Sequence, residues 1–214
     1  MNDGSAVAPS VTVRHEPVQA RAALRVEALL DAAAAVVDEH GIERLTTAMV
    51  AQRAGASIGT IYRYFPDRVA VLAALAERNL ERMRMAVERV LVAEHASLAD
   101  TVEAIAAGMV DTFREVPSFR FLRAGEGLGL GPGQRQPVVP VFVAEIAEHL
   151  RVRWGLDLDE EQQREVETAI GALDALVTYA FLHDPDGDPR YLRIGVDLVR
   201  ARLRAVLPQL GEAA

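Results

Sequence analysis

The sequence predicts an all-α protein, with an N-terminal three-helix helix-turn-helix domain, a larger C-terminal helical domain, and about nine helices in total. Three observations lead to this prediction. Apolar residues recur every three or four positions through most of the chain, which is the helical period. Capping residues precede the expected helices, and Gly or Pro follows them. Half of the 214 residues are apolar, enough to bury a substantial core.

The stretch from Leu45 to Leu72 is the most informative part of the chain. Thr46 or Thr47 can cap a first short helix, because a hydroxyl there accepts a bond from an unpaired N–H of the opening turn. Gly55 can take the positive φ that a sharp turn requires, and Ser57 can cap a second short helix. Two short helices joined by a glycine turn are the plan of a helix-turn-helix.

The second short helix has one apolar and one polar face. Ile58, Ile61 and Phe65 recur at helical spacing and form the expected buried face. At about 100° per residue, the residues expected to point outward are Gly59, Thr60, Arg63 and Tyr64, with Tyr62 at the edge of the core. A hydroxyl, a guanidinium and phenols suit a phosphate backbone and base edges. A helical pair with an ordinary polar surface has the same spacing, so both interpretations remain open on spacing alone.

Six segments of this stretch follow one another in a specific order: Thr46-Thr47, Val50-Ala51, Ala54-Gly55-Ala56-Ser57, Gly59-Thr60-Ile61-Tyr62, Tyr64-Phe65 and Asp67-Arg68. Together they closely resemble the DNA-binding signature of the tetracycline-repressor (TetR) family of bacterial transcriptional regulators. The resemblance extends back to Arg25 and covers roughly the first third of the chain. Arg68 stands where the family usually has lysine, and Ala56 where a larger aliphatic residue is common.

The resemblance implies a ligand-responsive regulator, most often a repressor, whose dimer binds a near-palindromic DNA operator. The residues it implies for the bases or nearby backbone of the major groove are Ser57, Gly59, Thr60, Arg63 and Tyr64. The residues it implies for phosphates are Thr47, Tyr62 and Arg68. It also implies a homodimer through two C-terminal helices, expected at residues 159–183 and 189–207, which would form a four-helix bundle.

The expected organisation has three parts. These are a flexible N-terminal arm at residues 1–18, the helix-turn-helix domain at 19–66, and a helical ligand-binding and dimerisation domain at 67–214. A long helix from Gln19 to His40 should back the helix-turn-helix. Arg25 near its start either reaches a phosphate or is simply exposed. Arg14 and Arg21 could touch phosphate from the arm, although a solvated arm is the simpler interpretation.

Five further helices are expected, at residues 67–94, 97–115, 137–155, 159–183 and 189–207. The first should link the two domains, with ion pairs such as Arg78–Glu81 and Arg84–Glu88 on a solvated face. Its expected inward series is Val69, Leu72, Leu75, Leu80, Met83 and Val87. The last presents one continuous apolar stripe made of Leu192, Val196, Val199, Leu203 and Val206. Five glycines between residues 125 and 133 suggest a flexible loop beside a pocket.

The sequence offers only candidates for a ligand pocket. They are Met83, Met109, Phe113, Phe119, Phe121, Trp154 and Tyr179. Aromatic residues at helical spacing more often form a core than bind a ligand. An apolar effector with few polar anchors fits such a list best.

Composition narrows the functional classes. The net charge of −8 argues against general coating of nucleic acid, but between Gly41 and Arg68 four arginines stand against two acidic residues. A modestly basic head on an acidic body suits a local DNA reader. All 23 basic residues are arginine, which is typical of a GC-rich bacterial genome. With no signal-peptide layout and no membrane-length apolar run, we expect a cytoplasmic protein.

The sequence contains no motif that clearly predicts a catalytic site or a metal site. The chain has no cysteine, and its five histidines are scattered. Glu145 and His149 lie four residues apart, but nothing completes a metal site, so a surface pair is favoured. Residues 184–189 imitate the opening of a calcium loop and fail its later positions; Asp188 before Pro189 is the N-cap of a helix. We expect no cofactor and no enzyme activity. The remaining alternative is an adaptor or enzyme that keeps the motif without binding an operator.

Overall fold

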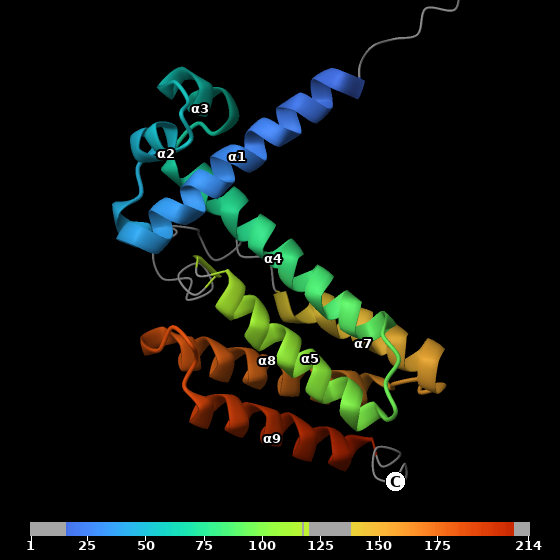
Figure 1. Cartoon of the computed structure of the whole chain (residues 1–214). Helices are drawn as coiled ribbons and strands as arrows, with labels where there is room; N and C mark the ends of the chain where they lie inside the picture. Colours follow the sequence, from blue (N-terminus) through green and yellow to red (C-terminus); the bar gives the residue numbers. More distant parts are fainter. Residues whose placement is uncertain (1–15, 117, 120–137, 208–214) are drawn as a thin grey trace, which may run out of the picture.

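The computed structural model describes residues 16–116, 118–119 and 138–207. This part of the chain is entirely helical, which confirms the predicted all-α fold (Figure 1). Its elements are α1 (Glu16–His40), the 3₁₀ turn η1 (Ile42–Arg44), α2 (Thr47–Arg53), α3 (Ile58–Tyr64), α4 (Arg68–Val92), α5 (Leu98–Glu115), α7 (Val138–Trp154), α8 (Glu160–His183) and α9 (Pro189–Val206). Within these ranges no helix is long and apolar enough to cross a membrane.

Side-chain caps fix where the helices begin. Thr46, rather than Thr47, accepts the backbone N–H of Met49 and starts α2, and Ser57 accepts that of Thr60 and starts α3. Gly55 between them has a φ of 58°, the positive value that the turn needs. Asp188 caps α9 ahead of Pro189, as predicted. The local chemistry of these residues therefore sets the helix-turn-helix and the last helix.

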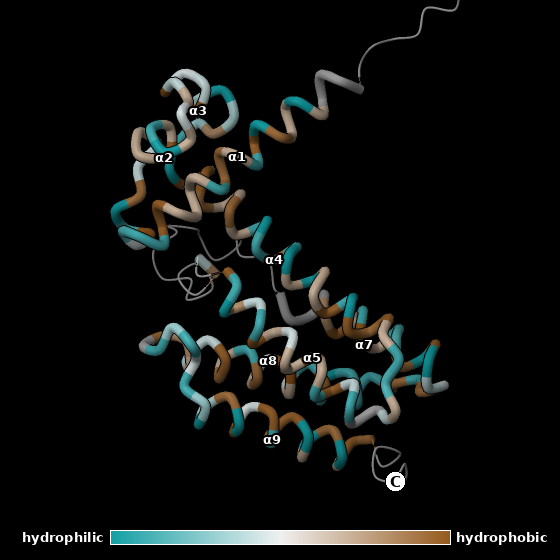
Figure 2. The backbone as a smooth tube through the Cα atoms, in the orientation of Figure 1, coloured by the Kyte–Doolittle hydropathy of each residue, from teal (hydrophilic) through white to brown (hydrophobic). Residues whose placement is uncertain are grey.

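Two apolar cores divide the molecule into a head and a body. The head is α1, η1, α2, α3 and the first two turns of α4; the body is the rest of α4 with α5, α7, α8 and α9. Val71, Leu72 and Leu75 of α4 are buried in the head, whereas Met83 and Val87 are buried in the body. The expected boundary between residues 66 and 67 stays a prediction, but in the packing α4 belongs to both cores. Figures 1 and 2 show α4 running from the head into the body.

The inner face of α4 differs from its predicted series in two places. Val69 was expected to point inward and is exposed, and Val71 is buried instead. Asn79 is only 2% exposed, while the expected Leu80 is only partly buried. Asn79 lies four residues after Leu75 and therefore on the same face of the helix. The buried face of α4 thus carries the Asn79 amide, and Leu80 lies at its edge. Apolarity alone could not have identified this position.

The apolar stripe of α9 packs inside the chain. Val199 and Leu203 are buried against the body core, and Leu192 and Val196 pack partly against it. Gly195 lets α9 approach α8 closely, because a Cβ there would lie 3.0 Å from Leu173 Cδ1. The outward side of these two helices still carries large apolar residues. They are Tyr179 and Leu182 on α8, and Ile194 and Leu198 on α9.

Candidate nucleic-acid interface

Two of the three apolar residues predicted for the buried face of α3 anchor this helix. The third, Ile58 at its first position, was expected to be buried and is 45% exposed. Ile61 and Phe65 are buried in the head core, which fixes how the helix is rotated. Ser57 Oγ accepts the Thr60 backbone N–H at 3.2 Å and lies 2.9 Å from Thr60 Oγ1. The two hydroxyls are therefore held together at the helix N-terminus, where N–H groups also favour an anion.

A second contact joins α2 to α3. The hydroxyl of Thr47, in the first turn of α2, lies 3.4 Å from the phenol oxygen of Tyr62, to which it is placed to donate. This distance is long for a bond between hydroxyls, so the interaction is weak. The phenol of Tyr62 remains exposed. The two residues implied for phosphate binding thus lie side by side on one surface.

Arg63 and Tyr64 form a small rigid unit. An Arg63 guanidinium nitrogen donates to the Tyr64 phenol oxygen at 2.7 Å, and its guanidinium carbon lies 4.9 Å from the Tyr64 ring centroid. No carboxylate in the described part of the chain forms a salt bridge with Arg63. Its charge is therefore held in place without being neutralised. A planar guanidinium of this kind suits bidentate binding to a guanine edge.

Arg68 has an internal role that the sequence did not indicate. Its Nε donates to the carbonyl oxygen of Leu45 at 3.0 Å, and one of its terminal nitrogens donates to the carbonyl of Ile42. These carbonyls belong to the turn between α1 and α2, where the Ile42 carbonyl also accepts the backbone N–H of Leu45 at 3.3 Å. The side chain is partly buried. The phosphate contact implied by the resemblance remains a prediction, and two of its donors already serve the fold.

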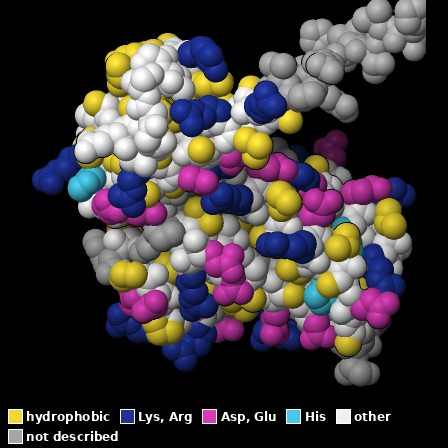
Figure 3. Space-filling view, turned by 45° about the horizontal axis from the view of Figure 1, so that its top comes forward, with side chains coloured by type: hydrophobic (Ala, Val, Ile, Leu, Met, Phe, Trp, Pro, Cys, Tyr) yellow, Lys and Arg dark blue, Asp and Glu magenta, His cyan; other side chains and the backbone are white. Residues whose placement is uncertain are grey.

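The charge around the head is uneven. In the space-filling view of Figure 3 arginines lie over both the head and the body, while most acidic side chains lie over the body and its boundary with the head. Arg53 of the head pairs with Glu39 at 2.6 Å. Arg63 on α3 has no such partner in the described chain. From Glu16 to Leu75 six arginines stand against seven acidic residues, so the head as a whole is not basic, and the excess of arginine is confined to the stretch from Gly41 to Arg68.

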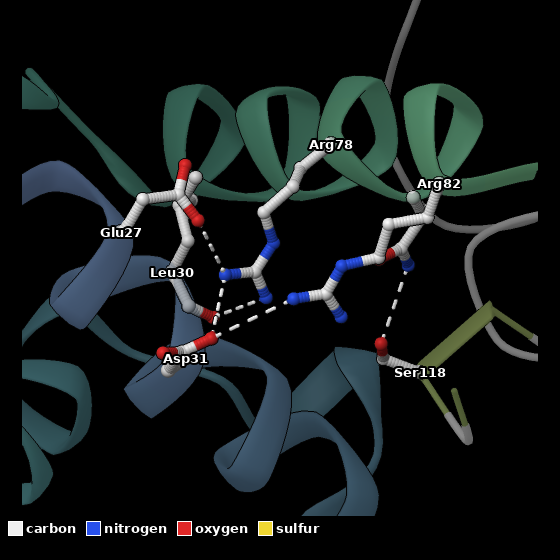
Figure 4. Close-up of polar contacts among 7 residues, drawn as sticks. Glu27, Leu30, Asp31, Arg78, Arg82 and Ser118 are labelled. Atoms are coloured by element: carbon white, nitrogen blue, oxygen red, sulfur yellow. Dashed lines mark hydrogen bonds and ion pairs between the residues drawn. The ribbon is translucent and has the colours of Figure 1, made fainter. Parts of the chain in front are cut away.

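The junction of head and body is held by a buried arginine. Arg78 on α4 donates to Asp31 at 2.7 Å, to Glu27 at 3.3 Å, and to the carbonyl of Leu30 at 3.1 Å, all on α1 (Figure 4). Its side chain is only 9% exposed. The predicted solvated Arg78–Glu81 pair was therefore wrong.

The acid expected beside Arg78 has another partner. Glu81 pairs with Arg84 at 2.7 Å, and Arg84 also lies 3.5 Å from Glu88, as predicted. The hydrogen bond from Arg84 to Glu81 holds the pKa of Glu81 below its usual value. Spacing along α4 could not have revealed that α1 supplies better partners for Arg78.

The next residue of α4 faces the body. Asn79 Nδ2 donates to Ser118 Oγ at 3.2 Å, and both residues are buried (Figure 4). Asn79 Oδ1 has no hydrogen-bond partner among the residues that the structure describes. Neighbouring residues of one helix thus bind α1 of the head and the segment after α5 of the body. Any shift of α4 acts on both.

The predicted pocket residues do not form one surface. Met83, Met109, Phe113 and Phe119 are buried in the body core, where Phe113 lies 4.7 Å from Phe119 between ring centroids. Trp154 packs partly against this core, and Phe121 and the glycine-rich loop lie outside the described residues. Tyr179 is 55% exposed on the outer side of α8, against Tyr191. Its place on the surface does not fit a role inside a pocket.

Two hollows in the body are lined by other residues. An open groove of about 580 Å³ lies between α7 and α8, and a small apolar hollow of about 20 Å³ lies where α4, α5, α7, α8 and α9 meet. His149 borders the small hollow, and burial, Arg153 and His95 lower its pKa. Glu145, which the sequence placed beside His149, lies 3.5 Å from Arg84. The described residues hold no group of three or more potential metal ligands.

This geometry defines a class of protein. A helix-turn-helix with a preformed polar helix, carried on a helical body, is the plan of a DNA-binding transcriptional regulator. Residues 29–75 match the family model described as bacterial regulatory proteins, tetR family. The structure of a TetR-family transcriptional regulator from Streptomyces coelicolor is 30% identical, with a TM-score of 0.66 over 86% of this chain and 99% of that one. The chain belongs to the TetR family of transcriptional regulators.

Other relatives agree in part. The fatty acid degradation regulator FadR from Bacillus halodurans shares the fold, with a TM-score of 0.60 and 20% identity over 82% of this chain and 94% of that one. The transcriptional repressor KstR of Mycolicibacterium smegmatis is 36% identical over 69 residues, which are 32% of this chain. The match spans only 34% of the length of KstR. The names of these relatives describe regulators of transcription rather than enzymes.

Proposed function

We propose that the chain is a homodimeric repressor in the bacterial cytoplasm that binds a near-palindromic operator and is released by a small hydrophobic ligand. The observation that carries the proposal is the outward face of α3. Ser57 is bonded to Thr60, Tyr64 fixes the Arg63 guanidinium, and Tyr62 is exposed beside Thr47. Because these groups are ordered before binding, the entropic cost of binding DNA is lower.

The roles proposed for these residues follow from their chemistry. Arg63 would read a base edge, with Ser57, Gly59, Thr60 and Tyr64 close to bases or the nearby backbone. Thr47, Tyr62 and Arg68 would hold phosphates on either side. Phosphate contacts position the protein, and base contacts specify the sequence. Two such heads, about one helical turn of DNA apart, require a near-palindrome.

The proposed dimer face is the outer side of α8 and α9, within the two expected ranges. Tyr179, Leu182, Ile194 and Leu198 form its exposed apolar part, and the Tyr179 ring lies 5.2 Å from that of Tyr191. Large exposed apolar residues on two neighbouring helices support an isologous contact with a second copy.

Ligand release would act through α4. The dimer would have two conformations that differ in the spacing of its heads, and only one spacing fits the operator. A ligand that binds the body more tightly in the other conformation shifts the dimer toward it and lowers operator affinity. Arg78 and Asn79 support this route, because they tie the same turn of α4 to the head and to the body. Met83, Met109, Phe113 and Phe119 are the proposed apolar neighbours of the ligand, with Trp154 at their edge.

Fluorescence anisotropy with labelled DNA from upstream of the gene tests the proposal. We expect binding that competitor DNA of scrambled sequence does not displace and that weakens steeply with salt. A thermal-shift screen with small hydrophobic compounds should find molecules that raise the melting temperature and lower operator affinity. A helical adaptor would show no sequence-selective binding at any salt concentration, and that result would refute the repressor.

A further inference from the structure

We propose that Asn79 and Ser118 form the polar anchor of the ligand site, and that the ligand is a neutral molecule whose polar group both donates and accepts a hydrogen bond. Hydroxyl, phenol and carboxamide groups have this property, whereas carboxylates, ammonium groups and plain hydrocarbons do not. The inference rests on the proposed ligand release and names the class of ligand that would cause it.

Asn79 lies on the inner face of α4 at the point where the two apolar cores meet. Leu75, four residues earlier, is buried in the head core, and Met83, four residues later, is buried in the body core. Asn79 itself is only 2% exposed. Bulk water therefore cannot satisfy its amide, which needs hydrogen-bond partners in the protein or in a ligand.

The amide of Asn79 is only partly satisfied. Its Nδ2 donates to Ser118 Oγ at 3.2 Å (Figure 4), and its Oδ1 has no partner within the described chain. The Ser118 hydroxyl in turn donates to no acceptor among the described residues. If the amide turns over, the bond between the two side chains reverses and again leaves one donor and one acceptor free. In either arrangement the pair offers both to a single polar group.

Other buried polar side chains of the body are complete. The hydroxyl of Thr101 donates to the carbonyl of Ser97 at 3.2 Å, and that of Thr112 donates to the carbonyl of Gly108 at 2.8 Å. A buried polar atom without a partner costs free energy, which is why folded proteins contain few of them. The incomplete amide of Asn79 is therefore explained most simply by a ligand that completes it.

The surroundings of Asn79 favour a neutral ligand. Four polar side chains are buried in the described chain, and all of them are neutral: Asn79, Thr101, Thr112 and Ser118. Arg78, the neighbour of Asn79 on α4, is already paired with Asp31 and Glu27 of α1. A carboxylate or an ammonium group beside Asn79 would therefore be buried without a counter-charge.

A ligand at Asn79 would act directly on α4. Neither of the two hollows described above is lined by Asn79, so the ligand must displace core side chains to reach it. Met83, one turn further along, can give way because its unbranched side chain adapts easily. Arg78 binds α1 from the adjacent position, so a shift of α4 here would also move the head. A trapped water molecule would complete the same bonds without any ligand, and the test must exclude it.

The test uses three probes of similar shape: para-ethylphenol, para-ethyltoluene, in which a methyl group replaces the hydroxyl, and para-ethylbenzoate, which is an anion. Titrations of the full chain are followed by NMR of isotope-labelled methionine methyl groups. The Met83 signal should shift, whereas that of the exposed Met85 should not. Wild type should bind para-ethylphenol about tenfold or more tightly than either other probe, because only the phenol completes the buried hydrogen bonds.

The variant Asn79→Leu/Ser118→Ala removes both members of the pair. It should bind para-ethylphenol and para-ethyltoluene equally well. Its midpoint of unfolding in urea should be no lower than that of wild type, because replacing both partners of a hydrogen bond by apolar groups is nearly neutral. The matched control is Thr112→Val, which removes a buried hydroxyl that is satisfied within its own helix. This control should keep the wild-type preference for the phenol.

Equal binding of para-ethylphenol and para-ethyltoluene by wild type is the result that a trapped water predicts, and it would overturn the inference. So would binding of none of the probes, tightest binding of para-ethylbenzoate, or a preference for the phenol that survives in the double variant. A double variant that is clearly less stable than Thr112→Val would show that the amide is structural. The proposed function is tested separately, since a wild type without selective operator binding refutes the repressor whatever the ranking of the probes.

Discussion

At the scale of single residues, Arg63 and Tyr62 separate reading a base from holding the backbone. Arg63→Ala should cost about 1–3 kcal/mol of operator affinity and relax the preference at one base pair. Tyr62→Phe removes a phenol that can reach phosphate and should weaken binding evenly across sequences. Anisotropy against a panel of single-base operator variants measures both. An equal loss of selectivity in the two variants would contradict this division.

His149 should make the body sensitive to acid. Burial, Arg153 and His95 lower its pKa in the folded state, so the unfolded chain takes up this proton at higher pH. Stability is therefore lost as pH falls below the unfolded value near 6.5, and is unaffected above it. His149→Gln should lose less stability than wild type between pH 7.5 and 5, measured by urea unfolding.

The control for this comparison is His40→Gln, which removes a half-exposed histidine of the head. Its stability should fall with pH as wild type does. If His149→Gln and wild type lose the same stability on acidification, the partly buried imidazole is not responsible.

At the scale of elements, the turn between α8 and α9 depends on Gly187. Its φ is 82°, and a Cβ there would lie 2.7 Å from Phe181 Cζ. Gly187→Ala should lose about 1–2 kcal/mol to the backbone and a further 1–3 kcal/mol or so to the clash. Gly155→Ala is the control, since its φ is 66° with no atom within 4 Å, and it should lose only the backbone part. If the two variants lose the same free energy of unfolding in urea, the Phe181 ring moves aside at no cost.

The stability of the contact between α1 and α4 should depend on Arg78 far more than on Arg82, one turn further along α4. Arg78→Met keeps the apolar stem but removes three donated bonds, one of them to the Leu30 carbonyl. We expect a loss of about 1–3 kcal/mol, partly offset because the unpartnered Nε also disappears. Arg82 is 43% exposed and 3.9 Å from Asp31, so Arg82→Met should change stability by less than about 0.5 kcal/mol. The free energy of unfolding in urea decides between them.

Sequence-based prediction succeeded where local chemistry decides. Caps such as Ser57 and Asp188, and the positive φ of Gly55, depend on residues a few positions away, so helix limits could be read directly. The partner of Arg78 could not be read, because Asp31 lies 47 residues earlier and competes with nearer acids. The same reason explains the inward turn of Arg68 toward Leu45.

The candidate site shows the same division. The outward face of α3 follows in part from helical geometry, and Arg63 is exposed as expected. The two tyrosines differ from the prediction: Tyr62, expected at the edge of the core, is 54% exposed, and Tyr64, expected to point outward, packs partly against the head core. The ligand pocket depends on how five helices pack, which periodicity does not specify. Tyr179 and Phe113 are both aromatic residues on helices and were both candidates for the pocket, yet one ring is on the surface and the other in the core.

At the scale of the whole molecule, dimer formation should control operator binding. Ile194→Arg/Leu198→Arg places two charges on the proposed face and should give a monomer by light scattering, with much weaker operator binding. Val152→Arg is the control, because Val152 is an exposed apolar residue on α7. It should remain dimeric. An unchanged mass for the double variant would mean that the copies associate elsewhere.

The sharing of α4 between the two cores has a consequence for anyone recombining such proteins. A fragment that ends at Pro66 would lack Val71, Leu72 and Leu75, which close the head core. A transplanted reader therefore needs its own α4 as far as Leu75, and the recipient scaffold must begin before Met83. The seven residues between them, including Arg78 and Asn79, form the seam. If ligand release acts through α4 as proposed, the parent that supplies these seven residues should decide whether a chimaera still responds to a ligand.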